Sequence, residues 1–147
     1  MLSNNNNINK NRFCIKINKW KIITPTKLFG GFNMGVLSTS PKNMDQCIEI
    51  CVKCARACEE CTTACLQESD VQARVKCIQM LNDCAEICFQ SVAFMARNSM
   101  YAKQHCQLCA AICEACAVEC EKFQDAHCQE CAKICRECAE VCRNMGS

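Results

Sequence analysis

Cysteine occupies the positions at which a helix of a bundle normally carries Leu or Ile. In the segment from Cys47 to Cys65, successive cysteines are separated by steps of 4, 3, 4, 3 and 4 residues. Alternating steps of three and four place side chains on one face of an α-helix, the face that packs against a bundle interior. Two later segments, residues 106–120 and 128–142, repeat the steps 3, 4, 3 and 4. The pattern therefore predicts helices with an inner stripe of sulfur.

Four helices joined by short turns account for this pattern. They are predicted over residues 44–67, 70–97, 100–122 and 125–145. The residues between the cysteines are mostly Ala, Glu, Gln, Lys and Arg, which favour helix. Helix boundaries are predicted at Ser69, Ser99, Asp125 and Gly146. Because short connections make consecutive helices antiparallel, we predict an all-α fold, an antiparallel up-down four-helix bundle with a cysteine-lined core.

The second predicted helix departs from the regular spacing. Its inner stripe holds only three cysteines, Cys77, Cys84 and Cys88. Its second half reads as ordinary hydrophobic core through Phe89, Val92, Phe94 and Met95. In an antiparallel bundle these apolar residues lie at the end that holds Cys47, and we expect them to close that end. We expect the opposite end, which holds Cys65, to be open.

Charge divides the chain at about residue 43. Residues 1–43 contain seven Lys or Arg and no acidic residue, whereas residues 44–147 contain ten Lys or Arg against fifteen Asp or Glu. We therefore predict a low-complexity basic leader over residues 1–43, disordered or a targeting segment, and a cysteine-rich four-helix bundle over residues 44–147. The acidic bundle argues against nucleic-acid binding. No run of about 18 apolar residues is present to span a membrane.

The leader is open to several interpretations. The interpretations are a disordered extension, a translation start assigned too far upstream of the true start at Met34 or Met44, a mitochondrial-type transit peptide, and a secretory signal whose apolar region is residues 28–37. We expect a cytoplasmic protein, or a mitochondrial or other organellar one if residues 1–43 are a transit peptide. Cys14 lies in this segment, apart from the other cysteines, and the pattern gives it no role.

The remaining nineteen cysteines require a chemical explanation. Disulfides suit the pattern poorly, because thiols one turn apart on a helix point in nearly the same direction. Cysteine as a small hydrophobic residue does not explain why nearly every Leu is replaced. Metal binding does explain it. The predicted ligands are Cys47, Cys51, Cys54, Cys58, Cys61, Cys65, Cys77, Cys84, Cys88, Cys106, Cys109, Cys113, Cys116, Cys120, Cys128, Cys131, Cys135, Cys138 and Cys142.

Charge distinguishes between the candidate metals. Zinc sites with four thiolates are dianionic, so several of them in one dry core would repel each other. A monovalent soft ion bound at about one per thiolate leaves the core near neutrality, and thiolates select Cu(I). At about 1.5 Å per residue, the segment from Cys47 to Cys65 makes a thiol-lined tube about 27 Å long. We therefore predict storage or buffering of many Cu(I) ions.

Two other functions remain open from the residues alone. A metallothionein-like zinc or cadmium buffer belongs to the same class of protein. An iron–sulfur or redox carrier would also use thiolates, although the compact C-x2-C-x2-C-x3-C run of cluster proteins is absent from the sequence. The sequence contains two histidines, no Gly-rich phosphate loop and no Ser-His-Asp candidates, so we do not expect an enzyme. It identifies neither a copper donor nor a recipient.

Two histidines and five methionines can add ligands to the thiols. His105 and His127 each precede the first cysteine of a predicted helix, and they lie at opposite ends of the bundle. His127 lies at the end predicted to be open, where an imidazole can accept Cu(I) before the thiolates do. A solvent-facing residue in a first helical turn explains it equally well. Five methionines offer thioether ligands, but we favour a packing role for most of them. They are Met44, Met80, Met95, Met100 and Met145.

Several stretches of the sequence together resemble the copper storage proteins, and more narrowly their cytosolic type. They are CIEICVKCARACEECTTAC, CIQMLNDCAEIC, HCQLCAAIC and HCQECAKIC, and the resemblance covers about residues 44–146. It implies Cu(I) held by thiolates along the core, a polar mouth with a histidine, here His127, and homotetramers. The exported type of this family carries a twin-arginine signal, which this sequence lacks. Residues 1–43 fall outside the resemblance.

Overall fold

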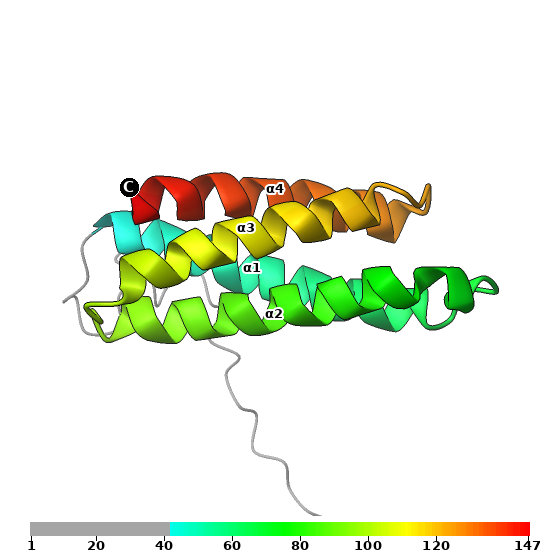
Figure 1. Cartoon of the computed structure of the whole chain (residues 1–147), viewed down its shortest axis with the longest axis horizontal. Helices are drawn as coiled ribbons and strands as arrows, with labels where there is room; N and C mark the ends of the chain where they lie inside the picture. Colours follow the sequence, from blue (N-terminus) through cyan, green and yellow to red (C-terminus); the bar gives the residue numbers. More distant parts are fainter. Residues whose placement is uncertain (1–41) are drawn as a thin grey trace, which may run out of the picture. The chain divides into compact units, whose positions relative to one another are not determined.

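Four helices lying side by side form the described part of the chain (Figure 1). A computed structural model describes residues 42–147, with side chains from Met44 onward. The helices are α1 (Lys42–Cys65), α2 (Val75–Ala96), α3 (Ala102–Cys120) and α4 (Ala126–Gly146), and a 3₁₀ turn, η2 (Val71–Arg74), precedes α2. Residues 42–147 contain no strand. The predicted all-α four-helix fold is confirmed.

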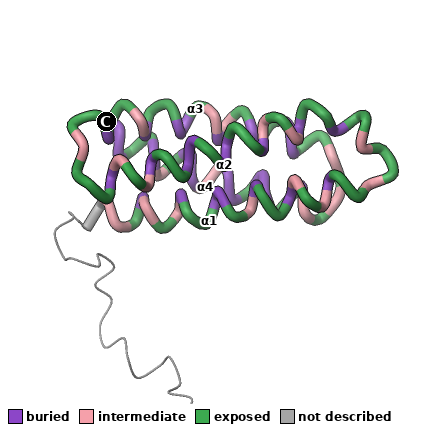
Figure 2. Tube along the Cα trace, turned by 90° about the horizontal axis from the view of Figure 1, so that it is seen from below, coloured by how far each residue is buried: buried purple, intermediate pink, exposed green. Residues whose placement is uncertain are grey.

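Each helix packs against two neighbours in an up-down arrangement. α1 packs against α2 and α4, and α3 packs against the same two helices. The start of α1 and the end of α4 lie at the same end of the bundle (Figure 1). Buried positions recur along the sides of the helices that face one another (Figure 2). The four inner stripes therefore share one interior, as an antiparallel bundle requires.

The interior of the bundle is built largely of sulfur. All nineteen cysteines from Cys47 to Cys142 are buried, and all are free thiols rather than disulfides. A protonated thiol behaves as a small hydrophobic group, so its burial is compatible with a stable core. Alanines such as Ala55, Ala117 and Ala139 are also fully buried. Their small side chains allow the helix backbones to approach each other around the thiols.

The inner row of α2 continues past its cysteines. The inward residues, all buried, are Cys77, Leu81, Cys84, Cys88, Ser91 and Met95. Phe89 was predicted in the core, but its side chain is 48% exposed. The reason is that Cys88 takes the inward position, and the next residue along a helix points about 100° away. Met95, in contrast, is fully buried.

The helix starts differ in detail from the predicted ones. Asp70 rather than Ser69 is the N-cap of η2, and its carboxylate binds Arg74 instead of capping the helix. Asp125 is the N-cap of α4, as predicted, but it also binds Arg74. α3 begins after Tyr101, whose backbone N–H donates a hydrogen bond to Oγ of Ser99 over 3.3 Å. Neither Asp70 nor Asp125, which was predicted to cap, caps its helix through its side chain, and both carboxylates bind the buried guanidinium.

Gly146 ends α4 where the helix touches α3, in agreement with the prediction. A Cβ atom at this position would lie 2.5 Å from Cγ of Gln107 and 3.2 Å from the backbone oxygen of Lys103. Nε2 of Gln107 donates a hydrogen bond to the backbone oxygen of Gly146 over 2.9 Å. Glycine therefore permits close packing of the C-terminal turn.

Residues 1–41 of the predicted leader, Cys14 among them, lie outside the described residues, and its last two residues, 42 and 43, belong to α1. Within residues 42–147, none of the helices combines the length and the apolar character that crossing a membrane requires.

Candidate metal centre

The thiols of the four helices meet in successive levels along the bundle interior. Near one end, Sγ of Cys51 lies 3.5 Å from Sγ of Cys142, which joins α1 to α4. Nearer the middle, Sγ of Cys84 lies 3.6 Å from Sγ of Cys113 and 3.9 Å from Sγ of Cys54, which joins α2 to α3 and α1. Side chains from separate helices thus converge to form a shared column of sulfur.

Donor atoms in this column form overlapping groups. In several sets of four cysteines, all Sγ atoms lie within 4.8 Å of one another. One set is Cys54, Cys84, Cys88 and Cys113. A second set contains Cys54 and Cys84 again, with two further thiols from α1 and α4. Separate tetrahedral sites need separate ligands, so the overlap favours ions that are linked through shared thiolates.

The sulfur spacing suits metal ions with few ligands. The sulfur–sulfur contacts between helices span from 3.5 Å, for Cys51 and Cys142, to 4.0 Å, for Cys84 and Cys135. Two metal–thiolate bonds of about 2.3 Å reach roughly 4.0 Å at a trigonal angle and roughly 4.6 Å when linear. Trigonal coordination therefore fits the column as it stands, and linear coordination needs small outward movements.

One end of the column, here called the His127 end, combines thiols with an imidazole. Cys61, Cys65, His127 and Cys128 place their donor atoms within 4.8 Å of one another. Nε2 of His127 lies 3.7 Å from Sγ of Cys65, and the imidazole side chain is 25% exposed. The structure thus places His127 where it touches both solvent and a thiol.

Part of the His127 end, which the sequence predicts to be open, is covered by an arginine, whereas His127 itself remains partly exposed there. The sequence pattern did not single out Arg74, yet its guanidinium lies over this end and its side chain is only 5% exposed. Nη1 donates a hydrogen bond to Sγ of Cys128 over 3.7 Å. The guanidinium also stacks on the Phe123 ring, 4.5 Å from the ring centre. The sequence does contain a signal for this role of Arg74. The residue lies three positions before Cys77, so it continues the inner row of α2.

Two carboxylates hold the buried guanidinium in place. Nε of Arg74 lies 2.6 Å from Oδ1 of Asp70, and Nη2 lies 2.8 Å from Oδ2 of Asp125. The hydrogen bonds and the positive charge of Arg74 hold the pKa of both carboxyl groups below their usual value. Both remain ionised near neutral pH, so the cation is paired and the two loops of this end are tied together.

Burial keeps the end thiol protonated in the metal-free protein. Desolvation, followed by the hydrogen bond with Cys65, raises the pKa of Cys128 to about 12. A neutral thiol avoids the cost of an unpaired charge in the core. A metal ion that binds this sulfur must therefore displace a proton.

The opposite end of the column, here called the Met95 end, differs in its chemistry. Sδ of Met95 lies 3.6 Å from Sγ of Cys106. His105, the second histidine, does not approach these sulfurs as His127 approaches Cys65. Its ring stacks on Phe94 with 4.1 Å between ring centres, and its Nδ1 lies 3.5 Å from Oγ of Ser91.

Comparison with known proteins places the chain in a family. The sequence profile described as copper storage protein matches residues 40–147, which include all four helices. The chain belongs to the copper storage protein family. All nineteen buried thiols lie within the residues that the profile matches.

Relatives of this copper storage protein include solved structures. A Cu(I)-bound copper storage protein from Bacillus subtilis is 47% identical, with 72% of this chain and 100% of that chain covered and a TM-score of 0.69. A cytosolic copper storage protein from Streptomyces lividans, described with five coppers, is 37% identical, with 71% and 92% covered and a TM-score of 0.68. The cysteine-rich protein YhjQ of Bacillus subtilis is 47% identical over 78 residues, 53% of this chain and 72% of that protein.

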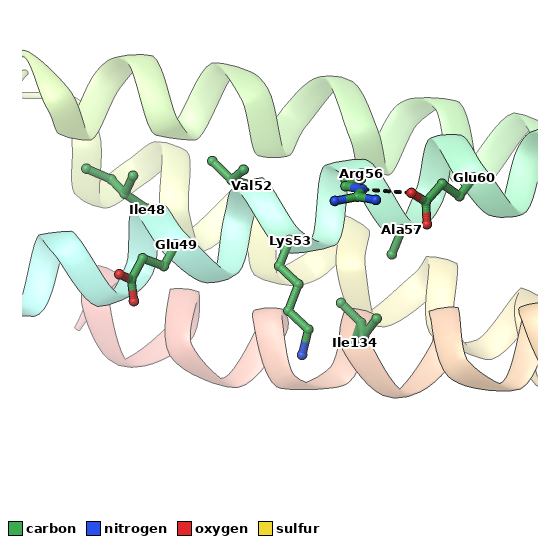
Figure 3. Close-up of a pocket in the computed structure, with 8 residues that line it drawn as sticks. All are labelled: Ile48, Glu49, Val52, Lys53, Arg56, Ala57, Glu60 and Ile134. Carbon is green, nitrogen blue, oxygen red and sulfur yellow. Dashed lines mark hydrogen bonds and ion pairs between the residues drawn. The ribbon is translucent and has the colours of Figure 1, made fainter. Parts of the chain in front are cut away.

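The copper storage protein also has a shallow groove on its outer surface, on the exposed side of α1 (Figure 3). The groove has a volume of about 600 Å³, and its lining contains Ile48, Val52 and Ile134 beside charged side chains. Lys53 extends toward α4 in the close-up and pairs with Glu137, and Arg56 pairs with Glu60. None of the described residues that line it is a cysteine, so the groove is separate from the sulfur column.

Proposed function

We propose that this protein stores Cu(I) on the thiolates that line its bundle core. The observation that carries the proposal is the continuous column of nineteen buried, unoxidised cysteines, with contacts between helices of 3.5–4.0 Å. Membership of the copper storage protein family supports it. So do the relatives described as Cu(I)-bound and as holding five coppers.

The proposed ligand set is the nineteen core cysteines, with His127 at the end of the column. Each Cu(I) that binds replaces a thiol proton, so the charge of the core changes little as ions accumulate. Trigonal or linear coordination allows one thiolate to serve two ions, as the overlapping groups of donors require. The capacity of the core is therefore set by the number of thiols rather than by separate four-ligand sites.

Storage rather than catalysis is the function that this arrangement supports. A catalytic metal keeps an open coordination position that a substrate can reach. Here the thiols at both ends and in the middle of the column are fully buried, among them Cys47, Cys84 and Cys128. We therefore propose that the bound ions are sequestered and that the protein is not an enzyme.

The proposed setting is a reducing compartment. Free thiols persist where glutathione and thioredoxin keep them reduced, and the Streptomyces relative is described as cytosolic. We propose a cytoplasmic protein whose storage function resides in residues 44–147, with an organellar location as the alternative if residues 1–43 act as a transit peptide. A homotetramer is proposed from the family resemblance alone.

Anaerobic titration of the full chain with Cu(I), in competition with a Cu(I)-specific chromophoric chelator, tests the proposal. We expect an end point near the number of core thiols, and a lower end point for Cys113→Ser. Cys14→Ser is the matched control, because Cys14 lies outside the described bundle, and it should leave the end point unchanged. An end point of four or five ions, matched by Zn(II), would favour a zinc-type buffer. Visible absorption of the protein as isolated would favour an iron–sulfur carrier.

A further inference from the structure

The Met95 end of the column contains a sulfur atom that belongs to a thioether. Met95 and Cys106 are both fully buried, and Sδ of Met95 lies 3.6 Å from Sγ of Cys106. Cys47 contacts Cys106 and also lies 3.6 Å from Cys142 by their Sγ atoms. We propose that Met95 is a copper ligand and forms, with Cys106 and Cys47, a terminal Cu(I) site. This inference rests on the proposed storage function.

The position of Met95 in α2 supports a ligand role. Going toward this end, the inner row of α2 changes from Cys88 to Ser91 and then to Met95. Ser91 is fully buried, and its hydroxyl faces Nδ1 of His105. A hydroxyl is a hard oxygen donor, whereas Cu(I) prefers soft sulfur. Beyond Cys88, Met95 is therefore the inward residue of α2 that offers a soft donor atom.

The choice of side chain separates ligation from simple packing. Leu81 shows that an inward position of α2 accepts an apolar side chain of similar size, and it is fully buried there. At Met95 the corresponding position carries a sulfur that contacts a thiol. With metal–sulfur bonds of about 2.3 Å, a sulfur separation of 3.6 Å gives an angle of roughly 100° at a bound ion. A third sulfur from Cys47 would complete a three-coordinate site.

The two ends of the column limit the build-up of negative charge in different ways. A column of thiolates tends toward excess negative charge, which is costly in a dry core. At the His127 end, the guanidinium of Arg74 lies against Cys128 and offsets that charge. At the Met95 end, a neutral thioether adds a ligand without adding charge. The ion takes the place of the Cys106 proton, Cys47 serves as a thiolate that it shares with the next ion of the column, and no change of oxidation state occurs.

Methionine-methyl NMR combined with titration tests this inference on the full chain. The variant is Met95→Leu, which conserves volume and so disturbs packing little. Met80→Leu is the control, because Met80 lies on the same helix and is only partly buried against the core. We expect Met95→Leu to reach the same Cu(I) end point as the wild type and Met80→Leu, because no thiol is lost, but to give up one Cu(I) per chain at a lower concentration of the chelator. In the wild type labelled with ¹³C at the methionine methyl groups, the resonance lost in Met95→Leu should shift on Cu(I) loading.

Two results would overturn the inference while leaving storage intact. One is a chelator competition curve for Met95→Leu that coincides with the wild-type curve over the whole titration. The other is a Met95 methyl resonance that does not move when the core is filled. Failure of the proposed function itself would look different, because the wild type would then take up few or no Cu(I) ions against the chelator.

Discussion

Nη1 of Arg74 donates a hydrogen bond to Sγ of Cys128 over 3.7 Å, at the end of the core where α4 begins. The contact joins a fixed positive charge to the first thiol of the α4 row. Arg74 is itself held by Asp70 and Asp125, which come from the loops on either side. A single guanidinium therefore covers part of the His127 end, beside the partly exposed imidazole, and compensates charge that develops there when thiols ionise.

Replacing Arg74 with Met should destabilise the metal-free bundle. The substitution leaves the carboxylates of Asp70 and Asp125 without their partner and removes the stacking on Phe123. Because both carboxylates remain partly exposed, we expect a loss of about 2 kcal/mol in the free energy of unfolding. Urea denaturation under anaerobic, reducing conditions measures it.

A surface arginine provides the control for that measurement. Arg136 forms ion pairs with Glu114 and Glu121, but its side chain is 41% exposed. Exposed ion pairs contribute little because water and salt screen them, so Arg136→Met should destabilise the protein less than Arg74→Met. Equal losses in the two variants would show that Arg74 has no special role at this end.

Replacing His127 with Ala should slow the uptake of Cu(I) with little change in capacity. The imidazole reaches both solvent and Sγ of Cys65, which lies 3.7 Å from Nε2. Stopped-flow mixing with a Cu(I)–chelator complex measures the rate, and we expect it to fall several-fold. His105→Ala serves as the comparison, because His105 packs against Phe94 at the other end. Unchanged uptake in His127→Ala would remove the role of this histidine.

Replacing Leu81 with Cys should extend the sulfur column. Leu81 is fully buried in the inner row of α2, between Cys77 and Cys84. The new thiol should raise the Cu(I) end point, although the smaller side chain costs about 2 kcal/mol of stability in the metal-free protein. Leu81→Ala creates a similar void without sulfur and should not raise the end point. Equal end points for the two variants would contradict the claim that capacity follows thiol number.

The metal-free bundle should lose stability at alkaline pH. Burial raises the pKa of Cys128 from 9.0 to about 12, so the folded state holds this proton more tightly than the unfolded chain does. The resulting stabilisation is complete below pH 9 and disappears as the pH rises to 12. Unfolding measured by circular dichroism should show a steeper decline over this range in the wild type than in Cys128→Ala. Parallel pH profiles for the two proteins would contradict the prediction.

The sequence predicted the rows of α1, α3 and α4 because cysteine itself marks their inner positions. The inner row of α2 was recognised only in part, because some of its positions carry no cysteine. These positions hold Leu81, Ser91 and Met95. Phe89 was assigned to the core on hydrophobicity, whereas the spacing of Cys84 and Cys88 turns it outward. Periodicity was thus a better guide to burial than residue type.

Contacts between distant segments were beyond the reach of sequence patterns. Asp70 and Asp125 are common helix-start residues, and each by itself predicts a cap. Only the folded chain brings both to Arg74, 51 residues before Asp125 in the sequence. These contacts hold Arg74 over part of the His127 end, and they also place its positive charge beside Cys128.

X-ray absorption at the copper K edge of the fully loaded, anaerobic protein tests the central claim most directly. Copper held on the core thiolates predicts an edge typical of Cu(I), two to three sulfur neighbours at about 2.3 Å, and a second copper close by. A first shell dominated by nitrogen or oxygen, or an edge typical of Cu(II), would contradict storage in the sulfur column.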